Sequence, residues 1–234
     1  MGVSYTALKR LQGWYIMGLL NKLKVLSKLS LTKFIYYNWF CSHVERHGRG
    51  MLLPYKNAVI EMDKGAKIVI EGDGSIAINP NRPRGSHAEA FIRMRENAVL
   101  RVHKSLSLCY KATIEIHKDA EVEIGSAYIN SDAVILAAKK ITLGEECLVS
   151  RMVFVFDADH HPIYNEAGEQ VNLPRPVVIG NHVWIGLQSV VVRGSKIGDG
   201  AVIAANSLVG GKIKDGTMAS GNPARSYSEI KWSV

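Results

Sequence analysis

The residues of this chain best suited to acid–base chemistry lie in one segment, FDADHHPIYNEAGEQVNLPRP. Asp157, Asp159, His160 and His161 form the densest cluster of histidine and carboxylate in the sequence. A neutral histidine can accept a proton at cellular pH, and a neighbouring carboxylate can fix its tautomer and stabilise the imidazolium. Two other interpretations stay open. The same side chains could make turn hydrogen bonds, or they could bind a metal with distant histidines, although those show no tight ligand spacing.

A six-residue repeat surrounds this segment. Counting in sixes from Ile179 gives a branched aliphatic residue at every step: Ile179, Ile185, Val191, Ile197, Ile203 and Val209. The next position is small in five of six cases: Gly180, Gly186, Val192, Gly198, Ala204 and Gly210. A third row, four positions after the first, holds small or modest residues: Val183, Ser189, Ser195, Ala201 and Ser207. A weaker row in a different phase lies upstream: Val102, Leu108, Ile114 and Ala120.

A period of six predicts a chain that makes a short strand, turns and makes another, so that successive coils stack in parallel about 4.8 Å apart. The branched residue would point inward, because β-branching suits a strand. The small residue after it would allow the dihedral angles of the corner. A sheet of antiparallel strands would show strict alternation and hairpin dipeptides instead, and these do not dominate. We therefore expect a parallel β-helix.

The repeat lapses between Val155 and Ile179. The turn-like stretch from Asn165 to Gly168 and the prolines Pro174 and Pro176 predict a loop that leaves the coil surface. The spacing across this stretch is a multiple of six, so composition rather than phase indicates the insertion.

The basic character of the chain lies in its first fifty residues, which hold eight Lys and Arg against one acid, whereas the other 184 hold 21 against 20. Apolar residues there recur at helical spacing: Leu8, Leu11, Tyr15, Leu19, Leu23 and Leu26. We expect a basic helical segment in residues 1–50 and a β-helix domain with a short C-terminal extension in residues 51–234. The helix would either pack its apolar stripe against protein or lie on an anionic membrane surface.

The remaining composition is that of a folded protein, with 47% hydrophobic and 21% charged residues. Three widely spaced cysteines predict reduced, mostly buried thiols rather than a disulfide framework. We see no secretory signal and no apolar run long enough to cross a bilayer. We therefore expect a cytoplasmic protein, with the N-terminal helix as its candidate contact with the inner face of the membrane. We expect no nucleic-acid partner, because the other 184 residues carry a net charge of only +1.

Together, the repeat, the His-Pro loop, PVVIGNHVWIG and GNPAR resemble the left-handed β-helix acyltransferases, in particular their galactoside and polysaccharide O-acetyltransferase branch. The resemblance covers about residues 125 to 230. It implies a mainly β fold, a left-handed parallel β-helix of hexapeptide repeats with an N-terminal helical segment and an active-site loop. It also implies acetyl-CoA as co-substrate, a sugar or glycan acceptor and a homotrimer with the site between neighbouring coils.

The resemblance also implies roles for individual residues. His161, with His160 as its rival, would deprotonate the acceptor hydroxyl, and Asp159 would orient or stabilise it. Trp184 would wall the thioester end of the cofactor, and the Gly186 N–H would lie near the oxyanion. The other cofactor contacts would be Ala204 and Ala205 at the pantetheine arm, and Arg225 and Lys212 near the phosphates.

Two departures from the family pattern concern the cofactor. The sequence AANS replaces the usual GAGS, and Gly210-Gly211-Lys212 replaces the usual Thr-Lys-Asp. Three alternatives to O-acetylation remain: N-acetylation of an amino sugar, free or nucleotide-linked; a metal-dependent β-helix hydratase; and a non-catalytic scaffold or membrane-surface adaptor. For the leading hypothesis we expect no resident metal and direct transfer in a ternary complex.

Overall fold

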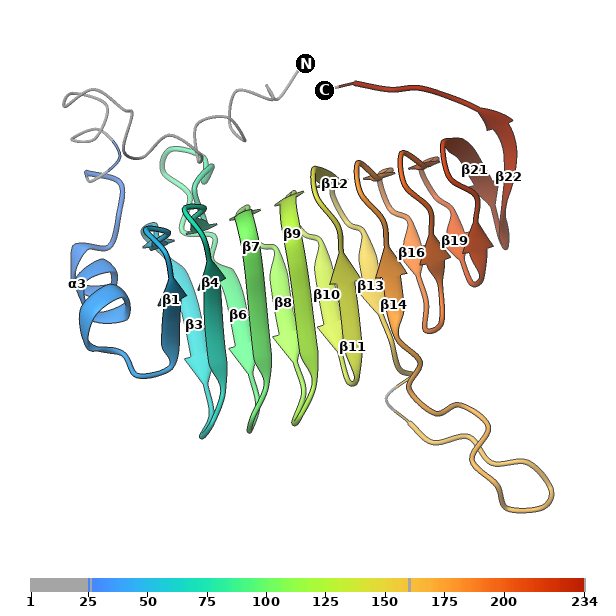
Figure 1. Ribbon diagram of the computed structural model, residues 1–234, viewed down its shortest axis with the longest axis horizontal. Helices are drawn as coiled ribbons and strands as arrows, with labels where there is room; N and C mark the ends of the chain where they lie inside the picture. Colours follow the sequence, from blue (N-terminus) through green and yellow to red (C-terminus); the bar gives the residue numbers. More distant parts are fainter. Residues whose placement is uncertain (1–24, 26, 160, 234) are drawn as a thin grey trace.

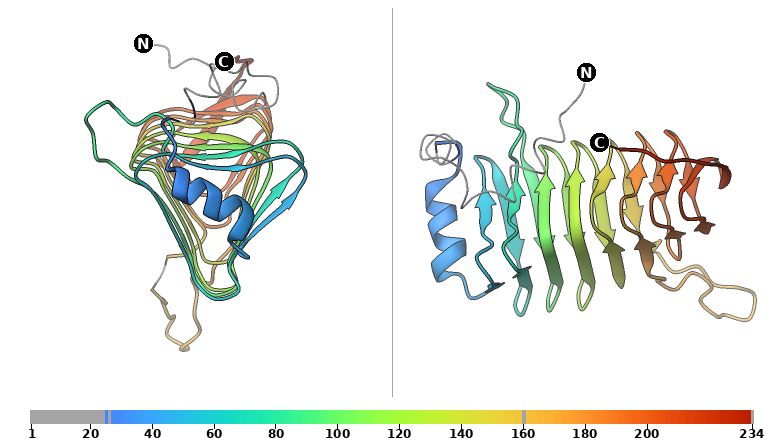
Figure 2. Two further views of the ribbon diagram at one scale, coloured as in Figure 1. Left: turned by 90° about the vertical axis from the view of Figure 1, so that its left-hand side faces the viewer. Right: turned by 45° about the horizontal axis from the view of Figure 1, so that its top comes forward.

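Three faces of parallel strands repeat along the chain, in the order that the six-residue repeat requires. The computed structural model describes residue 25, residues 27–159 and residues 161–233. Seen along its axis, the coil has a triangular cross-section (Figure 2, left), and its turns stack side by side from the N-terminal to the C-terminal end (Figure 1). The expected mainly β, parallel architecture is confirmed.

The first face contains β1 (Val44–His47), β4 (Lys67–Glu71), the first parts of β7 (Val99–Leu108) and β9 (Glu121–Ile129), β11 (Lys140–Leu143), β14 (Val177–Ile179), β17 (Lys196–Ile197) and β20 (Lys212–Ile213). The second face contains β2 (Leu52–Pro54), β5 (Ile76–Ile78), the second parts of β7 and β9, β12 (Cys147–Val149), β15 (Trp184–Ile185), β18 (Val202–Ile203) and β21 (Thr217–Gly221). An antiparallel strand, β22 (Ala224–Glu229), follows β21.

The third face is a separate sheet of seven strands. It contains β3 (Ala58–Met62), β6 (Ala90–Met94), β8 (Thr113–Ile116), β10 (Val134–Ala137), β13 (Phe154–Phe156), β16 (Val190–Val191) and β19 (Leu208–Val209). Each turn of the coil therefore visits the first, second and third faces in that order.

The core is the row of aliphatic residues that the repeat predicts. All six members of that row from Ile179 to Val209 are buried, the most exposed being Ile197 at 3%. The third predicted row, which contains three serines, is buried too. Of these serines, Ser189 donates from its Oγ to the carbonyl of Ala204, and Ser195 donates to those of Val192 and Val209. The small polar side chains thus satisfy backbone groups at the corners.

The glycines after the aliphatic row serve a different purpose from the one that the sequence suggests. Gly186 and Gly198 do not have positive φ angles, whereas the corner residues His182, Gln188 and Asn206 do. A Cβ atom at Gly198 would lie 2.6 Å from the backbone nitrogen of Asp215, and one at Gly186 would lie 2.6 Å from the Ile203 carbonyl oxygen. These glycines are needed because the next coil approaches too closely for a side chain.

The predicted loop is an insertion of one coil's length. Val155 pairs with Val191, 36 residues later, whereas Val191 pairs with Val209, 18 residues later. The extra 18 residues leave from the corner between the third and first faces, and Figure 1 shows them projecting below the coil. The ladder resumes in the same register after them, so the loop does not disturb the stacking.

A short helical segment covers the N-terminal end of the coil. It consists of α3 (Leu31–Ile35) and the π-helical turn η1 (Tyr36–Phe40). Buried Asn38 in η1 donates to the carbonyls of Phe34 and Leu52 and accepts from the Leu52 N–H, so it ties the segment to β2. No helix of the described residues is long and apolar enough to cross a membrane.

The amphipathic helix expected from Leu8 to Leu26 lies outside the described residues. The first coil strand, β1, begins at Val44, within the range assigned to the helical segment. The division of the chain at residue 50 therefore stays a prediction.

Replacing Gly198 with alanine tests the close-approach explanation. The added methyl group would overlap the backbone of Asp215, so we expect a loss of about 3 kcal/mol in the free energy of unfolding. Gly211→Ala is the matched control, because a Cβ atom there meets nothing within 4 Å, and it should change stability by less than about 1 kcal/mol. Urea unfolding measures both. Equal effects of the two substitutions would contradict the explanation.

Candidate active site

The neck of the inserted loop is fastened by Asp157, whose side chain is fully buried. Its carboxylate accepts three hydrogen bonds, of 2.6, 2.9 and 2.6 Å, from the backbone N–H groups of Ala138, Lys139 and Lys140. These three residues form the equivalent corner of the preceding coil. The Asp157 carbonyl also accepts from the Arg175 N–H, at 2.9 Å, which closes the neck. The first acid of the cluster is therefore structural.

The second acid, Asp159, connects the loop to the following coil. Its Oδ2 accepts a hydrogen bond of 2.8 Å from Nε of Arg193, and both side chains are half-buried. The Asp159 carbonyl accepts from the backbone N–H of His161, at 2.8 Å. The contact between the predicted acid and base is thus through the backbone, while the carboxylate is committed to Arg193, a residue that the sequence analysis did not single out.

A buried asparagine shapes the chain around the candidate base. Nδ2 of Asn172 donates to the His161 carbonyl at 2.7 Å, and its Oδ1 accepts from the Ile163 N–H at 2.7 Å. These two bonds fix the backbone on both sides of Pro162, while the His161 side chain is exposed. The imidazole has no hydrogen-bond partner within the described part of the chain, so it is available to an acceptor. The rival base, His160, lies outside the described residues.

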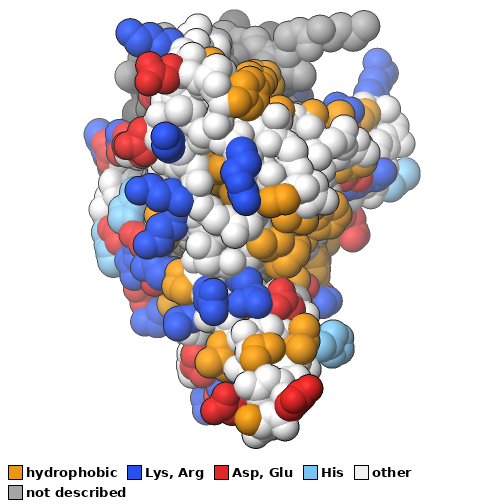
Figure 3. Space-filling view, turned by 90° about the vertical axis from the view of Figure 1, so that its right-hand side faces the viewer, with side chains coloured by type: hydrophobic (Ala, Val, Ile, Leu, Met, Phe, Trp, Pro, Cys, Tyr) orange, Lys and Arg blue, Asp and Glu red, His pale blue; other side chains and the backbone are white. Residues whose placement is uncertain are grey.

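The loop beyond His161 presents uncovered apolar side chains. Ile163, Tyr164, Val171 and Leu173 are between 48% and 61% exposed. Figure 3 shows apolar side chains gathered on this projection, with acids beside them. Such a cluster on a projecting loop is typical of a contact surface.

Trp184 projects outward from the second face, where it is 42% exposed. Its Nε1 donates to Oγ of Ser150 at 3.0 Å. The C-terminal tail returns along this edge of the coil (Figure 1) and brings the Trp232 ring to 6.0 Å from that of Trp184. Trp232 also stacks on His182, with ring centroids 4.0 Å apart. The tail therefore forms part of the surface around Trp184, and this contact could not be predicted from the sequence.

The backbone groups beside Trp184 differ in whether they are free to bind a ligand. The Gly186 N–H donates to the Ile203 carbonyl, and the Ala204 N–H donates to the Ala219 carbonyl. The next N–H in each case, that of Leu187 and that of Ala205, makes no hydrogen bond with the described residues. Both of these residues are exposed. The open donors therefore lie one position after Gly186 and Ala204.

The two predicted phosphate contacts lie on different parts of the coil. Arg225 is exposed on β22, opposite Ser220 of β21, beside the second face. Lys212 begins β20 on the first face, where it pairs with Lys196. Of the two, Arg225 is on the same side of the coil as Trp184.

One copy of the chain does not bring the candidate base to the Trp184 wall. The loop with His161 leaves the corner between the third and first faces, whereas Trp184 lies on the second face. Figure 1 shows the loop projecting below the coil and the tail that contacts Trp184 running along the top. In one copy, the loop and the surface around Trp184 therefore lie on different sides of the coil.

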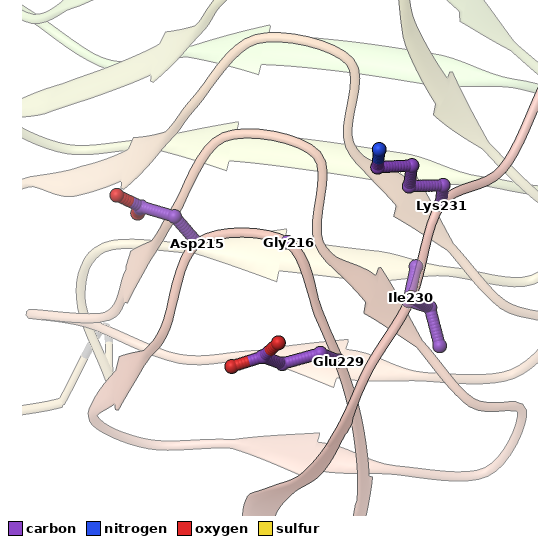
Figure 4. A pocket seen from close by; sticks show the side chains of 5 residues that line it. All are labelled: Asp215, Gly216, Glu229, Ile230 and Lys231. Carbon is purple, nitrogen blue, oxygen red and sulfur yellow. The ribbon is translucent and has the colours of Figure 1, made fainter.

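A cavity of about 450 Å³ lies under the C-terminal tail, lined by Asp215, Gly216, Glu229, Ile230 and Lys231 (Figure 4). None of the predicted site residues lines it. Among the described residues, no group of three or more His, Cys, Asp and Glu side chains is close enough to hold a metal ion.

The three cysteines are free and buried, as the sequence predicts. Burial raises the pKa of the Cys147 thiol to about 12 and also raises the pKa of Cys109. A thiol with so high a pKa is a poor nucleophile at neutral pH, so neither side chain is suited to accept an acyl group.

A family model described as bacterial transferase hexapeptide, six repeats, matches residues 176–211. Residues 176–211 of the coil therefore carry a hexapeptide repeat of this family. A crystal structure of a polySia-specific acetyltransferase superposes with a TM-score of 0.59 at 20% identity, covering 83% of this chain and 90% of that one. This likeness shows the fold, which is the left-handed parallel β-helix.

Two curated relatives are O-acetyltransferases. The galactoside O-acetyltransferase of Escherichia coli K12 is 32% identical over 145 residues, which are 61% of this chain and 66% of that protein. The polysialic acid O-acetyltransferase of Neisseria meningitidis is 33% identical over 82 residues, which are 34% of this chain and 38% of that protein. The chain thus matches less than two thirds of the length of either relative.

The neck of the loop can be tested with Asp157→Asn. The amide would place an N–H₂ group against backbone N–H donors, so we expect a loss of about 2 to 4 kcal/mol in the free energy of unfolding. The matched control, Asp159→Asn, breaks a half-exposed ion pair and should cost less than about 1 kcal/mol. Thermal and urea unfolding measure both changes. A larger loss at residue 159 than at 157 would overturn the structural role of Asp157.

Proposed function

We propose that the chain is an acetyltransferase that transfers the acetyl group of acetyl-CoA to a hydroxyl of a sugar or glycan. The observation that carries the proposal is a hexapeptide coil with a long insertion between β13 and β14, which presents an exposed His161 next to Pro162. The match of the coil to the hexapeptide family and the names of the two curated relatives support the same activity.

The proposed reaction begins when acceptor and acetyl-CoA are bound together. The imidazole of His161 takes the proton of the acceptor hydroxyl, and the oxygen attacks the thioester carbonyl carbon. The carbon–sulfur bond then breaks, and the CoA thiolate leaves and takes the proton back from the imidazolium. The high pKa of the buried Cys147 thiol fits direct transfer without an acyl-cysteine intermediate.

The developing negative charge needs a hydrogen-bond donor that is free before the reaction. We assign this role to the N–H of Leu187, because that of Gly186 already donates to the Ile203 carbonyl. By the same reasoning, the open N–H of Ala205 receives the pantetheine arm. Trp184 flanks the thioester, and Arg225 binds the nucleotide phosphates.

We further propose that the site forms between two copies of the chain, in a trimer. The positions of the loop and of Trp184 on different sides of one coil support this arrangement. The uncovered apolar side chains of the loop supply a contact surface for a second copy. A further apolar ladder faces outward on the third face, with 43% of the Phe154 side chain exposed: Val134, Phe154, Val190 and Leu208.

The choice of base is tested by alanine substitution at His161 and at His160. Removal of the general base should slow release of the CoA thiol by about 10²- to 10⁴-fold, measured with acetyl-CoA and a panel of mono- and oligosaccharides. His47→Ala removes an exposed histidine of the first coil and should leave the rate unchanged. If neither loop histidine affects transfer, the loop assignment is wrong.

The shared site is tested by mixing two inactive variants. His161→Ala removes the base, and Ala205→Trp blocks the proposed pantetheine path. If each site combines the loop of one copy with the wall of another, random assembly of equal amounts gives about a quarter of the wild-type activity, because half of the loops and half of the walls are intact. Separately folded variants, mixed without subunit exchange, should stay inactive. A site within one copy would give no recovery after joint refolding.

A further inference from the structure

A second cavity, of about 410 Å³, lies near the N-terminal end of the coil. Three segments that are distant in sequence form it: Ser27 and Lys28, Tyr55 and Lys56, and the stretch from Asn79 to Gly85. The last is part of the loop between β5 and β6, which projects from the corner between the second and third faces (Figure 2, left). Its size is within the range of small-ligand sites.

The charge of this cavity is uniformly positive. Four cationic side chains line it, and no carboxylate does: Lys28, Lys56, Arg82 and Arg84. None of the four forms an ion pair or a side-chain hydrogen bond with the described residues. Some cations elsewhere on the coil are matched across neighbouring strands, as in Arg101 with Glu71 and Lys118 with Glu96. Around this cavity, four cations come together without such a match.

The walls of the cavity are held by hydrogen bonds. The Lys56 N–H donates to the Lys28 carbonyl at 3.2 Å, and Nδ2 of Asn79 donates to the carbonyls of Lys56 and Ala88. Asn79 is 1% exposed, and its Oδ1 has no hydrogen-bond partner among the described residues. These bonds fix Asn79 and the two segments beside it, so the cavity walls are held by buried contacts.

We propose that this cavity binds the phosphate group of a phosphorylated molecule. Two guanidinium groups suit the oxygens of a phosphate, and a doubly charged group can neutralise two of the four cations. On the second face, β5 is followed by β7, β9, β12 and then β15, the strand of Trp184. Four strand spacings place the cavity about 19 Å from Trp184 along the coil axis. The cavity is therefore separate from the proposed cofactor contacts.

The phosphate of such a ligand could belong to a soluble sugar or polyol phosphate or to a phospholipid headgroup. Titration calorimetry with glycerol 3-phosphate and with inorganic phosphate measures the soluble case. Sedimentation with phosphatidylglycerol vesicles, against phosphatidylcholine vesicles, measures the lipid case. Each measurement compares wild type with Arg82→Gln/Arg84→Gln and with Lys64→Gln/Lys139→Gln, which removes two exposed charges outside the cavity. Thermal unfolding confirms that all three proteins are folded.

We expect saturable binding of glycerol 3-phosphate that weakens by at least about tenfold in the arginine variant and less than about twofold in the lysine variant. Binding of inorganic phosphate with the same dependence on the arginines would support recognition of the phosphate group itself. If only binding to phosphatidylglycerol vesicles weakens in the arginine variant, the ligand is a lipid headgroup. Equal losses in both variants, or binding in neither arm, would overturn the proposal. An arginine variant with weakened CoA binding would place the cavity in the cofactor site instead.

Discussion

The close stacking of consecutive coils is the constraint on which the rest of the structure depends. A Cβ atom at Gly144, Gly180 or Gly198 would lie within 3 Å of the next coil, so the backbones touch at this corner without a side chain between them. The aliphatic residue before each glycine fills the centre of the coil. Because consecutive turns from Gly125 to Gly198 repeat both features, one substitution at such a glycine affects two coils.

The same stacking turns outward-facing positions into ladders, and each face has a different chemistry. Acids and bases form ion pairs on the first face, where Lys140 contacts both Glu121 and Glu123. On the second face, Tyr128, Leu148, Trp184 and Val202 succeed one another. An apolar ladder lies on the third face. The coil therefore offers several surfaces that share one core, and surface chemistry can differ without a change of fold.

Much of the fold could be predicted from the sequence because the repeat is a local pattern with a geometric meaning. The aliphatic row, the parallel coil and the inserted loop were all predicted. The reason for the glycines was not predicted, because a close contact between successive coils leaves the same small-residue signal as a strained dihedral angle. Gly198 and its neighbour Asp215 illustrate the difference.

The candidate site was predicted less completely, since its partners are distant in sequence and have no pattern of their own. Asp157 and Asp159 look equivalent in the sequence, yet one is fully buried against three backbone N–H groups and the other pairs with Arg193. The roles of Trp232 and Asn172 could not be predicted from the sequence, because neither residue belongs to a motif or a repeat. His161 and Trp184 are separated because the loop leaves the corner between the third and first faces, whereas Trp184 lies on the second face. A count of six-residue repeats does not show on which face a residue lies.

The closed neck of the loop also bears on how this protein could change. The carboxylate of Asp157 and the bond from Arg175 end the insertion at the coil surface, and the ladder on either side keeps its register. The conformation of the loop beyond this neck is therefore not needed for the stacking of the coil. The tip of the loop could therefore lengthen, shorten or exchange side chains to suit another acceptor while the coil beneath it, and whatever binds along that coil, stays as it is.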